Sequence, residues 1–310
     1  MHEDYQGNLK QVQEIIENLP NLKNVYILGN PDTSVDPEFC NIAAREFIKK
    51  GKKVMFSTSG FNGLNTIKSL TKNINAENIK YISYSIDSLK NEKLQKLKGN
   101  KNINLEEIEK AILYCIKNNI KVKIQPTLWK LNQDEYKNIM QYFYDKYNIN
   151  WYTFHIGSFE AISGVESDVL KHIDPKKCVE IRNDIKNFAI KNNLKVQIPK
   201  VFITQEELKE YDYSETHCRI GGEGIQIWME KEFLRCTFCP IYAEINKDVC
   251  FNLVDKTFNF TDIKTICPVA EKCISNNLKS KSINFSGIVF EKNDKKYYNI
   301  CRYTSEKINY

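Results

Sequence analysis

Apolar strand-like runs alternate with helical patterns from residue 1 to about residue 200, and this alternation constrains the fold most strongly. Repeated strand–helix units with continuously apolar strands predict a parallel sheet covered by helices. An open twisted sheet and a full or partial barrel are both compatible with it. In either arrangement ligands bind at the carboxyl ends of the strands. We expect a first helix near 8–19 and strands at 24–28, 53–58, 79–87, 120–129, 150–157 and 194–198.

Two of the predicted helices have recognisable ends. Asp36 and Pro37 form an N-cap and first-turn pair, and that helix should stop before Gly51. Asn104 and Glu107 predict a capping pair at the start of another helix. The pattern opens with a helix although its repeating unit is strand then helix. Either a surface helix precedes the sheet, or a strand and its loop are missing from the chain.

The residues after about 210 differ in character because cysteines crowd there. Cys236 and Cys239 form a C-x2-C pair, and Cys239 and Cys267 are each followed by proline. Such spacing favours an iron–sulfur centre, with a structural zinc site and free buried thiols as the alternatives. Two short strands, 224–229 and 232–236, are expected to form a hairpin. The candidate metal ligands are Cys218, Cys236, Cys239, Cys250, Cys267 and Cys273.

The composition indicates where the protein resides in the cell and what it binds. No apolar run approaches the roughly 18 residues of a membrane span, and the first ten residues are unlike a signal peptide. We therefore expect a cytoplasmic protein without a membrane partner, in which cysteines bind metal rather than pair as disulfides. Cys40, Cys115 and Cys178 fall in helical patterns and are expected in the core, whereas isolated Cys301 fits either reading. The net charge of +6 comes from scattered lysines on a solvated face, so we do not expect nucleic-acid binding.

Several short motifs at the predicted strand ends resemble those of the radical S-adenosylmethionine (SAM) enzymes. The sequence LGNP, Leu28–Pro31, stands where that family has a GGEP-like motif. Thr58–Gly60 stands where a strand commonly ends in TNG, and Ser85–Asp87 matches a Ser-x-Asp strand end. Gln125 is the usual polar residue of the following strand. The resemblance covers nearly the whole chain through the order and spacing of these motifs.

The resemblance implies an α/β fold with a partial (β/α)6, TIM-like barrel that lacks its first strand, over residues 1–205. It also implies that residues 206–310 form a small cysteine-rich domain similar to the twitch and SPASM extensions, with an auxiliary [4Fe–4S] cluster. The positions carried over as SAM-facing are Gly29, Asn30, Ser85, Asp87 and Gln125. Asn30 replaces the family's glutamate, so it has no negative charge to pair with the SAM ammonium.

The family's C-x3-C-x2-C motif, which ligates the catalytic cluster, does not occur in this sequence. We expect a radical SAM-type enzyme that modifies a peptide or a small molecule and takes electrons from a donor protein. The chain as given would lack its first strand and motif through an incomplete gene and would be inactive. The alternatives are a non-catalytic radical SAM-like binding protein and an α/β protein with a structural zinc domain.

Overall fold

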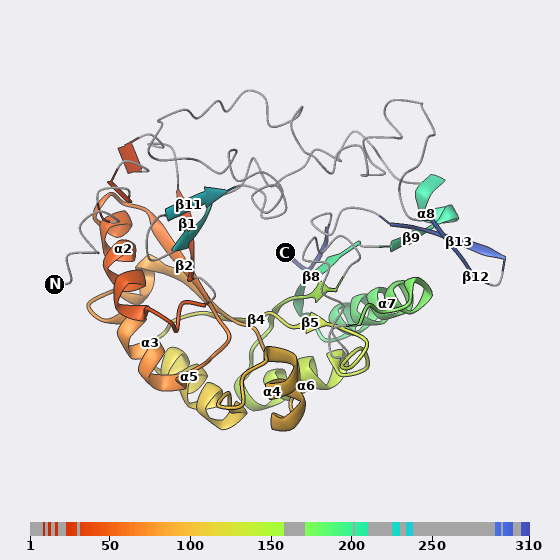
Figure 1. The fold of residues 1–310 in the computed structure, drawn as a ribbon, viewed down its shortest axis with the longest axis horizontal. Coiled ribbons are helices and arrows are strands. Elements are labelled where there is room, and N and C mark those ends of the chain that lie inside the picture. Colours follow the sequence, from red (N-terminus) through yellow and green to blue (C-terminus); the bar gives the residue numbers. More distant parts are fainter. Residues whose placement is uncertain are drawn as a thin grey trace. The chain divides into compact units, whose positions relative to one another are not determined.

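The computed structural model describes most of the first two hundred residues and several later segments (Figure 1). Clustering of contacts divides the chain into two compact units, residues 1–124 with 221–259 and residues 125–220 with 260–310. The described residues are 9, 12, 13, 16, 17, 23–29, 32–157, 171–200, 202–209, 225–229, 234–237, 289–292, 294–299 and 305–310.

The first unit is built on parallel strands that follow one another in space in the order β1, β2, β3, β4. Its helices are connections between successive strands, and α2, α3 and α5 run along the outer side of the strands (Figure 1). This is the strand–helix alternation that the sequence predicts. The elements are β1 (Asn24–Gly29), α2 (Pro37–Lys49), β2 (Lys53–Thr58), α3 (Gly63–Thr71), the 3-10 helix η1 (Ala76–Asn78), β3 (Ile79–Tyr84), α4 (Asn91–Lys98), α5 (Leu105–Lys117) and β4 (Val122–Ile124).

The two faces of this sheet differ in chemistry because successive strand residues point to opposite sides. On one face the side chains are apolar and buried, as for Ile27, Phe56 and Ile82. The strand register places polar side chains on the other face, where Ser57 lies beside Ser83 and Ser83 beside Lys123. We call this polar side of the sheet the inner face. It leads towards the carboxyl ends of the strands, where parallel sheets bind ligands.

Local capping explains where two helices begin. The carboxylate of Asp36 accepts a hydrogen bond from the Phe39 N–H at 3.0 Å, and α2 ends before Gly51, as predicted. Asn104 accepts from the Glu106 N–H at 2.8 Å and so caps α5. Glu107, predicted as the other half of this cap, instead accepts from Lys110 at 2.6 Å.

A hairpin from late in the chain joins the first unit. Strand β10 (Ile225–Met229) pairs in parallel with β1, and β11 (Leu234–Thr237) pairs antiparallel with β10. The predicted hairpin is therefore confirmed, and it extends the sheet at the edge of β1. The predicted domain boundary between residues 205 and 206 stays a prediction.

The second unit combines α6 and α7 with several short strands. Strand β6 pairs in parallel with β8, and β14 pairs antiparallel with β8. Strands β12, β13 and β9 form an antiparallel sheet, and β5 pairs with β7. The elements are β5 (Thr127–Leu128), α6 (Tyr136–Tyr147), β6 (Trp151–Thr153), β7 (His155–Ile156), α7 (Pro175–Lys191), β8 (Lys195–Pro199), β9 (Phe202–Thr204), α8 (Gln205–Lys209), β12 (Val289–Lys292), β13 (Lys295–Asn299) and β14 (Ser305–Ile308).

Three predicted strands are shorter or interrupted. The run 120–129 divides into β4 and β5 around Pro126, since proline has no N–H for the ladder. The run 150–157 divides into β6 and β7, and the run 79–87 ends at Tyr84. The parallel-rich α/β class is confirmed, while barrel closure, the missing first strand and the cysteine-rich domain stay predictions.

Two further expectations concern helices. Each described residue between 9 and 17 is helical, with Val12 and Ile16 buried, in agreement with the predicted first helix. Within the described part of the chain, no helix combines the length and apolar character that crossing a membrane requires.

Candidate functional site

Hydrogen bonds join the carboxyl ends of β1 and β2. The Asp32 carboxylate, in the loop after β1, accepts from the Thr58 hydroxyl at 3.0 Å and from the Ser59 N–H at 2.5 Å. Thr33 also donates its hydroxyl to the Ser57 carbonyl at 2.8 Å. A carboxylate that accepts from backbone N–H and hydroxyl groups is held in a charge-assisted network. The loop after β1 is therefore fixed against the end of β2.

The network continues to β3. Ser85 is the first residue after β3, and its N–H donates to the Thr58 carbonyl at 2.9 Å. The Ser85 hydroxyl accepts from the Lys98 ammonium at 2.6 Å, and Asp87 forms an ion pair with the same ammonium at 2.7 Å. We call Asp32, Thr58, Ser59, Ser85, Asp87 and Lys98 the strand-end cluster.

The Lys98–Asp87 ion pair of the cluster is largely buried. The side chain of Asp87 is 4% exposed and that of Lys98 is 15% exposed. An ammonium has three N–H donors. Two of them are used within the described structure, by Ser85 and Asp87, and the side chain still reaches solvent. The cluster thus presents a fixed positive group at the end of β3.

A second lysine lies on the inner face of the sheet. Lys123 of β4 is 6% exposed, and its ammonium lies 4.2 Å from the ring centroid of Tyr81 and 5.8 Å from that of Tyr26. Desolvation by burial, assisted by the positive charge of Lys80, lowers the pKa of Lys123 to about 7. Burial raises the pKa of Tyr26, which also hydrogen-bonds with Ser57 and Ser83. This face can therefore place an amine near its titration point beside phenol and hydroxyl groups.

In the second unit Gln125 lies beside a histidine. The Gln125 amide nitrogen and His155 Nε2 are 2.6 Å apart, so the amide can donate to a neutral ring. His155 is exposed and belongs to β7, which pairs with β5 through Thr127. This contact gives Gln125 a polar neighbour that the sequence motif did not indicate.

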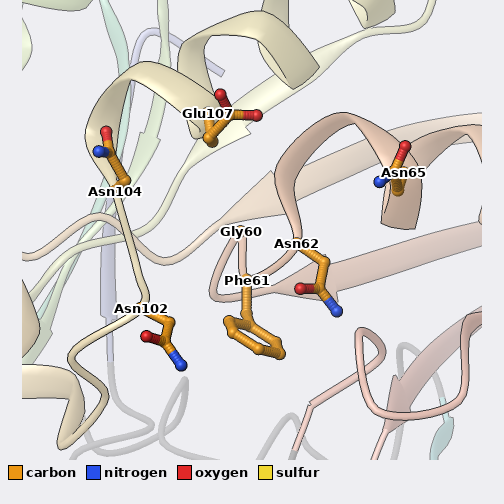
Figure 2. A pocket seen from close by; sticks show the side chains of 7 residues that line it. All are labelled: Gly60, Phe61, Asn62, Asn65, Asn102, Asn104 and Glu107. Carbon is orange, nitrogen blue, oxygen red and sulfur yellow. The ribbon is translucent and has the colours of Figure 1, made fainter.

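A pocket of about 390 Å³ opens near the end of β2, where α3 and α5 begin (Figure 2). Asn62 caps α3 with φ of 56° and makes no side-chain capping bond. The Phe61 ring lies between Asn62 and Asn102 (Figure 2). The lining carries one carboxylate, that of Glu107, and no positive charge, so the pocket suits a neutral or cationic polar group rather than an anion. It is lined by Gly60, Phe61, Asn62, Asn65, Asn102, Asn104 and Glu107.

The structure brings some of the predicted SAM-facing residues together. Ser85 and Asp87 share Lys98, and Gly29 is the last residue of β1. Gln125 contacts His155, and Asn30 lies outside the described residues. The SAM-facing role of each stays a prediction.

The predicted metal ligands stay predictions as well. Among the described residues, no group of His, Cys, Asp or Glu is arranged to hold a metal ion. Cys236 is described as a backbone position on β11, opposite Ile227. The other predicted ligands, Cys218, Cys239, Cys250, Cys267 and Cys273, lie outside the described residues, as does Cys301.

The helical cysteines are core residues, as predicted. Cys40, Cys115 and Cys178 are free thiols and buried. Burial raises the pKa of all three, to about 12 for Cys115 and Cys178. Neutral buried thiols pack as small apolar groups and are poor nucleophiles.

Two residues of the cluster were missed in the sequence. Lys98 was grouped with solvated lysines, although it stands four residues after Leu94 and beside Leu97, both buried in α4. That spacing places it on the inward stripe of the helix and could have identified it. Asp32 follows the predicted strand end closely, which is where parallel sheets gather functional side chains.

Comparison with protein-family models identifies part of the chain. Residues 2–143 match the family model described as Radical SAM superfamily. No curated protein matches the chain. The matched residues include β1, β2, β3, β4 and every member of the strand-end cluster.

Proposed function

We propose that this chain, whose residues 2–143 match the Radical SAM superfamily model, is a radical SAM protein that binds SAM at the carboxyl ends of β1, β2 and β3. The proposal rests on one observation above others. The matched segment has a hydrogen-bonded polar cluster at the sheet edge where such folds bind ligands.

The chemistry of the cluster fits the amino-acid part of SAM. That part has an ammonium and a carboxylate, and the cluster offers both an acidic and a basic side chain. Asp87 and Ser85 already hold one ammonium, that of Lys98, at hydrogen-bonding distances. Together with a reduced [4Fe–4S] cluster, SAM bound there would supply the one-electron radical chemistry of the reaction.

The chain's own residues contribute position rather than redox chemistry. Asp32 fixes the loop after β1 to Thr58 and Ser59, and Thr58 is joined to Ser85. Because these bonds connect three adjacent strand ends, a ligand bound there meets a preorganised surface. The family match implies that an electron donor is also needed.

For the substrate we propose a peptide rather than an anionic small molecule. The pocket beside α3 and α5 offers carboxamides that both donate and accept, together with the Phe61 ring. These groups match the N–H and C=O groups of a peptide backbone. A phosphate or carboxylate would find no cation among the lining residues.

For the cysteine-rich segment we propose an auxiliary iron–sulfur cluster, with structural zinc as the alternative. The 310 residues contain no C-x3-C-x2-C motif.

Equilibrium dialysis of anaerobically purified protein against SAM and S-adenosylhomocysteine tests the binding site. We expect both to bind, and Asp32→Ala to weaken both because it removes two of the hydrogen bonds that hold the loop after β1 to the end of β2. Glu46→Ala is the control, since Glu46 only pairs with Lys49 on α2. If the wild-type protein binds neither ligand, the proposal is wrong.

Two further measurements separate the alternatives. Iron and acid-labile sulfide in the purified protein support the auxiliary cluster, whereas zinc alone supports a structural zinc domain. Bound SAM that releases no 5′-deoxyadenosine on reduction with dithionite supports a non-catalytic binding protein.

A further inference from the structure

Polar side chains form a row across three strands on the inner face of the first unit. Ser57 of β2 lies beside Ser83 of β3, and Ser83 lies beside Lys123 of β4. The register places Tyr26 of β1 and Tyr81 of β3 on the same face, one layer nearer the start of the strands. Tyr26 hydrogen-bonds with both serines. This face therefore gathers an amine, two phenols and two hydroxyls, none of which belongs to the strand-end cluster.

The surroundings of Lys123 favour its neutral form. The side chain is 6% exposed, and its Nζ lies 4.2 Å from the ring centroid of Tyr81 and 5.8 Å from that of Tyr26. Those two phenols are the titratable groups that face it, and Lys80 adds positive charge from β3. Burial first, and then the charge of Lys80, lower the pKa of Lys123 to about 7. Desolvation and a neighbouring cation are the two means by which proteins convert a lysine into a nucleophile.

We propose that Lys123 is an imine-forming residue, which binds the carbonyl group of a small aldehyde or ketone on the inner face of the first unit. The Nζ lone pair attacks the carbonyl carbon, and a C–N bond forms as the carbonyl π bond breaks. The carbonyl oxygen then leaves as water with the two amine protons, and a C=N bond remains. The exchange needs no oxidant or reductant, and it does not depend on the proposed SAM site.

The neighbours of Lys123 fit the steps of this reaction. The Ser83 hydroxyl, next to it in the register, can donate and accept a proton while the oxygen leaves. A protonated imine is a cation, and the Tyr81 ring already lies at a distance that stabilises a positive charge on the nitrogen. A carboxylate or phosphate ligand would require the protonated amine, which burial disfavours. A carbonyl compound is the class of ligand that requires the neutral amine.

Reductive trapping of the wild-type protein tests the inference. Acetaldehyde is the probe at pH 7, sodium cyanoborohydride reduces any imine to a stable secondary amine, and peptide mass spectrometry measures alkylation at each lysine. Exposed Lys121, just before β4, is the internal reference. We expect Lys123 to react at least about tenfold faster, because an ordinary lysine with a pKa of about 10.4 is almost wholly protonated at pH 7. In concentrated urea the two rates should become equal. Equal rates in the native protein, or a difference that persists in urea, would overturn the inference.

A serine variant separates a built site from a merely reactive amine. Ser83→Ala removes the hydroxyl beside Lys123 and should slow its alkylation by roughly tenfold or more, the least that positioned proton transfer contributes. Ser69→Ala makes the same chemical change on α3 and should leave the rate unchanged. Alkylation of Lys123 in Ser83→Ala at the wild-type rate would show that no site assists the reaction and would contradict the proposal. The comparison with Lys121 uses the wild-type protein, so it decides the question even if Ser83→Ala does not fold.

Discussion

The Lys123 ammonium lies 4.2 Å from the centre of the Tyr81 ring, and the two residues belong to adjacent parallel strands, β4 and β3. A cation over an aromatic face gains electrostatic stabilisation that is largest when water is excluded. In Lys123 the cost of burying the charge exceeds this gain, because burial lowers the pKa of the ammonium to about 7. The inner face of the sheet therefore contains an amine that titrates near neutral pH.

Stability should rise with pH because of Lys123. Between pH 7 and about 10.4 the unfolded lysine is protonated and the folded one is largely neutral, so the unfolded state binds more protons. Lys123→Met should therefore be more stable than the wild-type protein below pH 7, by a margin on the order of a few kcal/mol. The margin should shrink as the pH rises towards 10. Urea unfolding at pH 6, 8 and 9.5 measures it, with the exposed Lys121→Met as the control. A margin that is independent of pH would contradict the lowered pKa.

Breaking the Asp87–Lys98 pair should destabilise the first unit. Asp87→Asn leaves a poorly solvated ammonium without its carboxylate, and loss of one partner of a buried pair costs about 3–5 kcal/mol. Glu107→Gln breaks the exposed Lys110 pair and should cost less than about 1 kcal/mol. Chemical denaturation of both variants compares them. Similar losses for the two would mean that Asp87 is solvated in the native protein.

Gly60 should not tolerate a side chain. Its φ is +84°, and a Cβ there would lie 2.5 Å from Ile108 Cγ1 in α5. Gly51 has a similar φ of +72° but nothing within 4 Å, so Gly51→Ala reports the backbone cost alone, about 1–2 kcal/mol. Gly60→Ala should lower the free energy of unfolding further, by at least about 1 kcal/mol more. Thermal unfolding of both variants measures the difference, and equal losses would show that Ile108 moves aside.

Replacing Cys236 and Cys239 together by serine should remove the proposed auxiliary centre. The measurement is iron and sulfide content after anaerobic purification. Cys40→Ala is the matched control, since its thiol is buried and neutral in α2 and should not bind metal. Unchanged iron in the double variant would show that other residues hold the cluster.

The sequence predicts the regular elements of the first unit well, for a physical reason. The run 53–58 matches β2 residue for residue because it is a short apolar segment between a helix and a polar turn. Asp36 and Asn104 both cap helices as expected, since capping depends on neighbouring residues only. Interruptions are harder to foresee. The division between β4 and β5 could be predicted only from Pro126, because the residues on both sides of it continue the apolar pattern of a single strand.

The candidate site is less predictable because its contacts connect segments distant in sequence. Ser85 and Asp87 were identified as strand-end residues, but their partner Lys98 comes from the far end of α4. Lys123 was not singled out, since a lysine within a strand gives no sign of which face it occupies. Only the register with Ser83 places it on the inner face.

The pairing of β1 with β10 joins residues 24–29 to residues 225–229. We expect such a long-range contact to form late in folding, because the chain between the two strands must first be brought together. Until then the unpaired backbone groups of β1 form an open edge that can recruit another chain. Expression fragments that end before residue 225 would keep that edge permanently, so aggregation of short fragments would reflect a missing neighbour of β1 rather than an unstable core.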